Sequence, residues 1–205
     1  MIKNIYFAFL FMVLVAACNQ MGPLDRYSVS INNYRDKKDS LFKFNADQSP
    51  LPNETRRYFR QLTYYAPDST YRLEADYQKI PNPDTLIMQG THGDKRPFLR
   101  EGVLYFKIKG KDYKLIAYKS VPKLGENLQS SELFVPFYDE TNKKETHGSG
   151  RYLDIEYNGQ DKVMLDFNYA YNPYCEYNNG FTCPITPFEN KLPIRIEAGE
   201  KRWEL

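Results

Sequence analysis

The sequence lacks the short motifs that mark most familiar chemistries. It contains no glycine-rich phosphate loop, no nucleophile elbow and no His-x-x-x-His pair, and each of these patterns supplies a group that its reaction requires. Histidine is also scarce, since His92 and His147 are the only two. The residues therefore give no support to nucleotide-dependent, α/β-hydrolase or zinc-protease chemistry, and we expect no cofactor.

The chain also lacks an excess of charge and a repeat. Its 28 basic and 26 acidic residues give a formal net charge of +2, and the two signs are interspersed. Nucleic-acid binding normally requires a strongly basic face, so we expect no nucleic-acid partner. No internal repeat or coiled-coil heptad is present.

Long hydrophobic runs are absent except for one near the N-terminus. This run extends from Ile5 to Ala17, follows Lys3 and ends at Cys18. A helix needs about 20 apolar residues to span roughly 30 Å of hydrocarbon, so a retained transmembrane anchor is disfavoured. A basic start, a short apolar region and small residues before the cleavage point are typical of a secretory signal.

The last four residues of that segment, Val15-Ala16-Ala17-Cys18, resemble the lipobox of bacterial lipoproteins. The resemblance implies cleavage before Cys18, acylation of its thiol, for example with palmitate, and an exported protein anchored to a bacterial membrane on its periplasmic or cell-surface face. Removal of residues 1–17 leaves 188 of 205 residues, which suits one domain. We predict a signal peptide over 1–17, a tether over 18–30 and a single β-rich domain over 31–205.

The periodicity predicts mainly antiparallel β-structure, as a sandwich or an open barrel, with two short N-terminal helices. One helix begins at Asn32 or Asn33 and runs to Phe44, with Tyr34, Lys38 and Leu41 on one face, and the second begins after Pro52 with Asn53 as its cap. Alternating residues predict strands. The expected strands are 71–77, 85–88, 96–100, 103–108, 113–118, 132–137, 150–157, 162–168 and 194–197. The clearest hairpin turns at 109–112, and a further turn is expected at Asn158-Gly159.

Cys175 and Cys183 flank a turn-prone tip at 178–180. In an oxidising exported compartment they are expected to form a disulfide, which would stabilise the fold by about 2–3 kcal/mol. The alternative is a zinc site made by both cysteines and His147, although cysteine ligands are usually two to four residues apart.

The segment from Leu133 to Glu200 resembles a bacterial family without assigned activity, domain-of-unknown-function family 1684. The resemblance rests on an ordered set of motifs: FVPFYD at 134–139, ETHGSGRYL at 145–153, DFNYAYNP at 166–173, Cys175, CP at 183–184, EN at 189–190 and AGE at 198–200. It extends more loosely back to residue 53. The family pattern usually has Tyr where this chain has His147, so the resemblance implies no function for a histidine at that position.

Polar residues concentrate in three of these segments, and we consider six of them as ligand-binding candidates: Arg151, Asp166, Asn168, Asn172, Glu189 and Asn190. If strands 150–157 and 162–168 are neighbours, Arg151 and Asp166 lie at the same end of the sheet. Alternation then places Met164, Asp166 and Asn168 on one face. These residues form either a structural hydrogen-bond network or a pocket in which Arg151 meets an anion.

Three function classes follow. Aromatic residues make up 16% of the chain, including 18 tyrosines, which suits strands and also suits walls that bind small molecules or glycans. We therefore expect a binding or accessory module of the cell envelope. The alternatives are a hydrolase of an envelope glycan or ester that uses Asp166 or Glu189 as a base, and a structural partner in a larger envelope complex.

Overall fold

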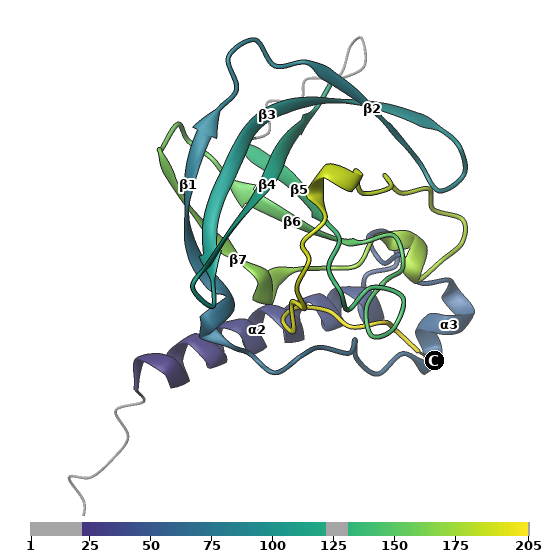
Figure 1. The fold of residues 1–205 in the computed structure, drawn as a ribbon. Helices are drawn as coiled ribbons and strands as arrows, with labels where there is room; N and C mark the ends of the chain where they lie inside the picture. The colour runs from purple at the N-terminus through teal and green to yellow at the C-terminus, as the bar shows by residue number, and fades with distance from the viewer. Residues whose placement is uncertain (1–21, 122–130, 205) are drawn as a thin grey trace, which may run out of the picture.

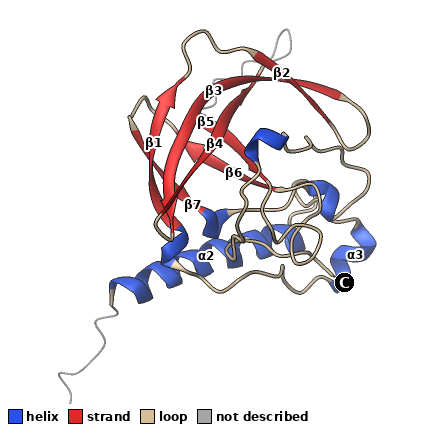
Figure 2. Ribbon diagram, viewed as in Figure 1, coloured by secondary structure: helices blue, strands red, loops and turns tan. Residues whose placement is uncertain are grey.

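A computed structural model describes residues 22–121 and 131–204, so Cys18 and the signal segment lie outside the described residues. The fold is a strongly curled antiparallel sheet that forms a nearly closed barrel, with α2 lying across one end (Figures 1 and 2). The predicted fold class, mainly β with an open barrel, is confirmed. No helix within 22–121 or 131–204 is long and apolar enough to cross a membrane.

Seven strands form the sheet. They are β1 (Arg72–Lys79), β2 (Thr85–Gln89), β3 (Lys95–Ile108), β4 (Lys111–Ser120), β5 (Glu132–Phe137), β6 (Arg151–Glu156) and β7 (Lys162–Asp166). The order is β6-β5-β4-β3-β1-β7, and β2 pairs with the first part of β3. The predicted strands 96–100 and 103–108 are one bent strand, because a β-bulge between Arg100 and Gly102 lets β3 continue.

The hairpin predicted at 109–112 is confirmed between β3 and β4. Lys109 and Gly110 have φ values of 50° and 76°. Tight two-residue hairpin turns need positive φ at these central positions, because only then does the turn match the twist of the two strands. The Asn158-Gly159 turn does not produce the expected pair, because β6 pairs with β5 and β7 pairs with β1. The barrel therefore has a seam between β6 and β7.

One predicted strand ends too late and another predicted strand is not formed, and side chains explain both. Strand 162–168 stops at Asp166, whose carboxylate accepts the N–H of Asn168 and starts the 3-10 helix η2 (Phe167–Tyr169). Segment 194–197 is not a strand. The N–H of Ile196 donates to Asp139 and its carbonyl accepts from Arg151, so side chains occupy the groups that a sheet ladder would use.

The barrel interior is filled by side chains from all around the sheet. Fully buried members include Leu104, Leu115, Val135, Leu165 and Phe167. In β7, Val163 and Leu165 are buried and Met164 between them is exposed, as the predicted alternation requires, but Asp166, predicted on the same face as Met164, is buried as well.

Helix α2 (Pro23–Phe44) is longer than predicted, because it begins within the segment assigned to a tether. Pro23 is the first helical residue, a position where its fixed φ and missing N–H cost nothing. Helix α3 (Asn53–Tyr58) starts where predicted, but Pro52 is its N-cap residue and Asn53 makes no capping bond. The C-terminal half of α2 packs on a second small core that contains Phe42, Phe59 and Tyr177.

Candidate functional site

A large open groove lies outside the barrel, with a volume of about 980 Å³. Eight aromatic side chains line it, together with three basic residues and one carboxylate. The aromatic residues are Tyr34, Phe42, Phe98, Phe134, Tyr152, Tyr171, Tyr174 and Phe181, and the charged residues are Lys37, Lys38, Arg96 and Asp154. We call this cavity the aromatic groove.

The first wall of the aromatic groove is the outward face of β3, β5 and β6. Side chains alternate between the two faces of a strand, so the residues between the inward-facing core residues point outward. Phe134 faces Asp154 across the β5–β6 pair. The ring of Phe134 stacks on Phe98 with 5.4 Å between centroids and meets Tyr152 edge-on at 4.8 Å.

The second wall is α2, whose residues Tyr34, Lys38 and Leu41 line the groove together, as their three- and four-residue spacing predicts. The third wall is the irregular segment 171–184, held to the sheet by two backbone hydrogen bonds of 2.9 and 3.0 Å between Tyr171 and Tyr152. The groove thus joins three segments that are far apart in the sequence.

The charges around the aromatic groove are unequally satisfied. Lys38 pairs with Glu200, and Arg96 pairs with Asp94 at 2.7 Å. Lys37 forms no ion pair with any residue in the described ranges and its side chain is exposed. Lys37 is therefore the cation of the groove that is free to meet an anionic group.

The carboxylate of Asp154 is exposed inside the groove and accepts a 2.6 Å hydrogen bond from the Tyr171 hydroxyl. The surrounding walls remove part of its hydration, which raises the pKa of Asp154 above its usual value. The pKa of Tyr171 is raised for the same reason and by the neighbouring carboxylate. Asp154 can therefore accept hydrogen bonds from hydroxyl groups.

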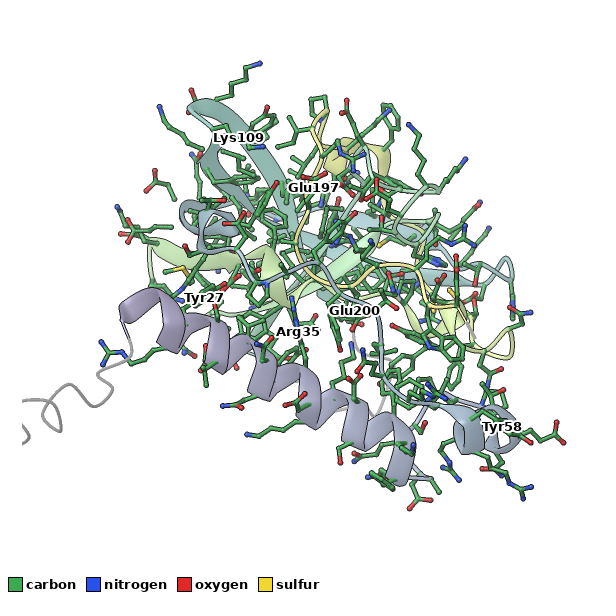
Figure 3. The ribbon with its side chains drawn as sticks, turned by 90° about the horizontal axis from the view of Figure 1, so that it is seen from below. Tyr27, Arg35, Tyr58, Lys109, Glu197 and Glu200 are labelled. Atoms are coloured by element: carbon green, nitrogen blue, oxygen red, sulfur yellow. The ribbon has the colours of Figure 1, made fainter. Side chains whose placement is uncertain are left out.

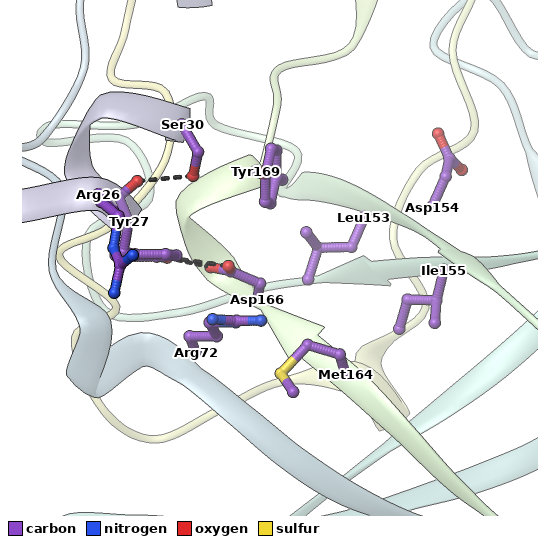
Figure 4. A pocket seen from close by; sticks show the side chains of 10 residues that line it. All are labelled: Arg26, Tyr27, Ser30, Arg72, Leu153, Asp154, Ile155, Met164, Asp166 and Tyr169. Carbon is purple, nitrogen blue, oxygen red and sulfur yellow. Dashed lines mark hydrogen bonds between the residues drawn. The ribbon is translucent and has the colours of Figure 1, made fainter. Parts of the chain in front are cut away.

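A second, smaller cavity of about 430 Å³ lies where α2 covers the seam (Figure 4). There the hydroxyl of Tyr27 donates to both carboxylate oxygens of Asp166, at 2.9 and 2.8 Å, and burial raises the pKa of Tyr27. Arg72 lies 5.4 Å from the centre of the Tyr27 ring. Asp166 is thus engaged in holding the helix to the barrel.

The six predicted binding residues do not share one pocket. Asp166 and Asn168 are neighbours, 3.0 Å apart, and Asn168 also bonds both backbone groups of Asp68. Arg151 is elsewhere. It is fully buried and bonds Asp139 and the carbonyls of residues 196, 198 and 200.

The other three predicted residues have their own partners. Asn172 bonds Glu200 and the carbonyl of Lys201 (Figure 3 shows Glu200 near α2). Glu189 accepts from Tyr118 at 2.6 Å and from Arg100 at 2.9 Å.

Asn190 ties the backbone of Ile116 to that of Pro136. Asp166 lines the small cavity under α2, whereas Glu189 lines a different cavity beside β2, so neither of these cavities brings the two carboxylates together. The contacts of these residues match the structural-network alternative.

Cys175 and Cys183 are both free thiols in this structure, with the N–H of Cys175 donating to Sγ of Cys183 at 3.2 Å. The Cys175 thiol stabilises a Cys183 thiolate, which lowers the pKa of Cys183 and raises that of Cys175. The disulfide is not formed here and stays a prediction. Among residues 22–121 and 131–204 no cluster of three potential ligands could hold a metal ion.

Sequence reasoning missed the aromatic groove. Alternation within 132–137 and 150–157 could have shown that Phe134 and Tyr152 face outward, but nothing local indicates that α2 and segment 171–184 cover them. The groove depends on tertiary contacts over more than a hundred residues.

The fold and the groove define a small open-barrel β-protein with an external aromatic groove. The chain belongs to domain-of-unknown-function family 1684, described as a protein of unknown function, whose model matches residues 57–201. It is also similar to the solution NMR structure of an uncharacterized protein of Haloarcula marismortui. The identity is 33%, the TM-score is 0.65, and the match covers 86% of this chain and 94% of the other. No curated protein matches the sequence.

Proposed function

We propose that the protein is a lipid-anchored binding module of the bacterial cell envelope, and that its aromatic groove takes a small amphipathic molecule with a flat apolar part and an anionic group. The observation that carries the proposal is the eight aromatic side chains around about 980 Å³, beside the unpaired Lys37. Small-molecule sites are typically apolar clefts of about 300–1,000 Å³ with a few polar groups.

The chemistry of the walls specifies the ligand. Stacked and edge-on rings offer flat apolar contact, and the ammonium of Lys37 at the rim suits a carboxylate, sulfonate or phosphate. Asp154 and the Tyr171 hydroxyl can orient a hydroxyl group of the ligand. We propose that the groove binds this molecule without converting it.

The proposed anchor is the acylated Cys18. Pro23, where α2 starts, is five positions further along, so at most about 18 Å of chain separates the helix from the membrane surface. Cys18→Ser should move the protein from the membrane fraction to the soluble fraction. Equal membrane association of Cys18→Ser would contradict the anchor.

A fluorescent naphthalene sulfonate, which combines a fused ring with one anionic group, is a direct probe of the groove. We expect saturable binding by the folded protein in the micromolar range. Ser120→Trp, which fills the groove from the end of β4, should weaken binding at least 30-fold, whereas Ser120→Ala should leave it unchanged.

Lys37→Gln should weaken binding about twofold to fivefold, because an exposed charge contributes up to about 1 kcal/mol. Tyr58→Ser is the matched control, since Tyr58 is 78% exposed and lies away from the groove. Equal binding by wild type and Ser120→Trp would refute the proposed function.

A further inference from the structure

A serine, a histidine and a glutamate form a hydrogen-bonded chain outside the aromatic groove. Oγ of Ser149 lies 2.6 Å from Nε2 of His147, and Nδ1 of His147 bonds Oε2 of Glu176. An ionised carboxylate can only accept, so Nδ1 carries the hydrogen and Nε2 accepts from the serine hydroxyl. This is the order of nucleophile, base and orienting carboxylate that activates a serine.

The base and its carboxylate are both held in place. The second oxygen of Glu176 accepts the backbone N–H of Trp203 at 3.0 Å. The carbonyl of His147 accepts from Nδ2 of Asn142 at 2.7 Å and from the N–H of Gly150 at 3.3 Å. The imidazole therefore has a fixed position between the hydroxyl and the carboxylate.

Exposure to solvent increases from the carboxylate to the histidine to the serine, so the hydroxyl is the group that a substrate can reach. The side chain of Glu176 is 9% exposed and that of His147 is 15% exposed, whereas Ser149 is half-buried at the surface. The backbone N–H groups of Gly148 and Ser149 make no hydrogen bond to any other residue of the described ranges. Donors beside the hydroxyl are thus available to a developing oxyanion.

We propose that Ser149 is the nucleophile of a second site, which hydrolyses small esters through an acyl-serine. Oγ of Ser149 forms a bond to the ester carbonyl carbon while Nε2 of His147 takes the hydroxyl proton. The ester C–O bond then breaks, and the leaving alcohol takes that proton. Water repeats the sequence and releases the acid. No metal or redox partner is needed, and the proposal does not rest on the function of the groove.

The family pattern in the resemblance described above usually has Tyr at the position of His147. That difference supplies a matched control, since His147→Tyr restores the family residue and should fold. A competing nucleophile is Cys175, whose Sγ lies 3.9 Å from Nε2 of His147. The test must therefore locate the modified atom.

The experiment is labelling of the folded protein, lacking residues 1–17 as after processing, with a fluorophosphonate, followed by intact mass and peptide mapping. We expect one adduct, on Ser149. Its rate of formation should fall at least 100-fold in Ser149→Ala and His147→Tyr and about tenfold in Glu176→Gln, with circular dichroism as the test of folding. Ser40→Ala, an exposed serine on α2, should label normally.

A matching burst of p-nitrophenol from p-nitrophenyl acetate should disappear in the same variants. The proposal is overturned if folded wild type carries no adduct on Ser149, if the adduct lies on Cys175, or if His147→Tyr labels at the wild-type rate. Because the adduct is located in the wild-type protein, a variant that fails to fold leaves the proposal testable.

Discussion

Arg151 is predicted to hold the C-terminal segment against the barrel. Its guanidinium is fully buried and donates to Asp139 and to the carbonyls of Ile196, Ala198 and Glu200. Asp139 in turn accepts the N–H of Ile196 at 2.7 Å. Arg151→Met keeps most of the side-chain volume but removes every one of these donors.

Breaking a buried pair by removing one partner costs about 3–5 kcal/mol, because the other charge is left without its partner. We expect Arg151→Met to lower the free energy of unfolding by about 4 kcal/mol, a large part of the 5–15 kcal/mol of a typical domain. Adding Asp139→Asn removes the stranded charge. The double variant should therefore be about 1–2 kcal/mol more stable than Arg151→Met alone.

Urea unfolding followed by circular dichroism and by the fluorescence of Trp203, the only tryptophan, measures these differences. The matched control is Arg195→Met, because Arg195 is 38% exposed and pairs with Glu145 at the surface. That control should cost less than about 1 kcal/mol. A loss below 1 kcal/mol for Arg151→Met, or a double variant less stable than the single one, would refute this reasoning.

Three further predictions concern α2 and the cysteines. Burial raises the pKa of Asp39 to about 6, so between about pH 4 and 6 the folded state binds more protons than the unfolded state. The free energy of unfolding therefore falls as pH rises through that window. Asp39→Asn should flatten this fall in a urea-unfolding series, and an unchanged slope would contradict the assignment. Tyr27→Phe removes a donor to Asp166 and should cost about 1–2 kcal/mol, with faster hydrogen exchange at the start of α2; unchanged exchange there would count against the contact. Under oxidising conditions the protein should become about 2 Da lighter as Cys175 and Cys183 join, whereas free thiols with stoichiometric zinc would show a metal site instead.

Local patterns predicted most of the barrel strands because alternation and turn chemistry act over a few residues. The 109–112 hairpin is the clearest case, since Lys109 and Gly110 have the positive φ values that its short loop requires. The predicted pairing of 150–157 with 162–168 is wrong. A turn brings two strands close together but does not require them to form hydrogen bonds with each other. Which strand lies beside β7 is decided by the closure of the whole sheet.

The start of α2 was missed because Gly22 and Pro23 are typical of a linker, whereas contacts with the barrel, such as that of Tyr27 with Asp166, favour a helix. The six candidate residues were chosen for ligand binding, and that role stays a prediction. Their grouping could not be predicted, because Arg151 and Asp166 lie on different sides of the seam and bond different segments. The aromatic groove could not be predicted either, because its walls come from segments that are far apart in the sequence.

Ligand binding in the aromatic groove is tested most directly by mapping the naphthalene sulfonate on the protein with aromatic proton–carbon NMR spectra. We expect large shifts for Phe98, Phe134 and Tyr152, with small shifts for Tyr58 and Tyr105, which lie outside the groove. Shifts confined to residues outside the groove, or the same shifts in Ser120→Trp, would contradict it.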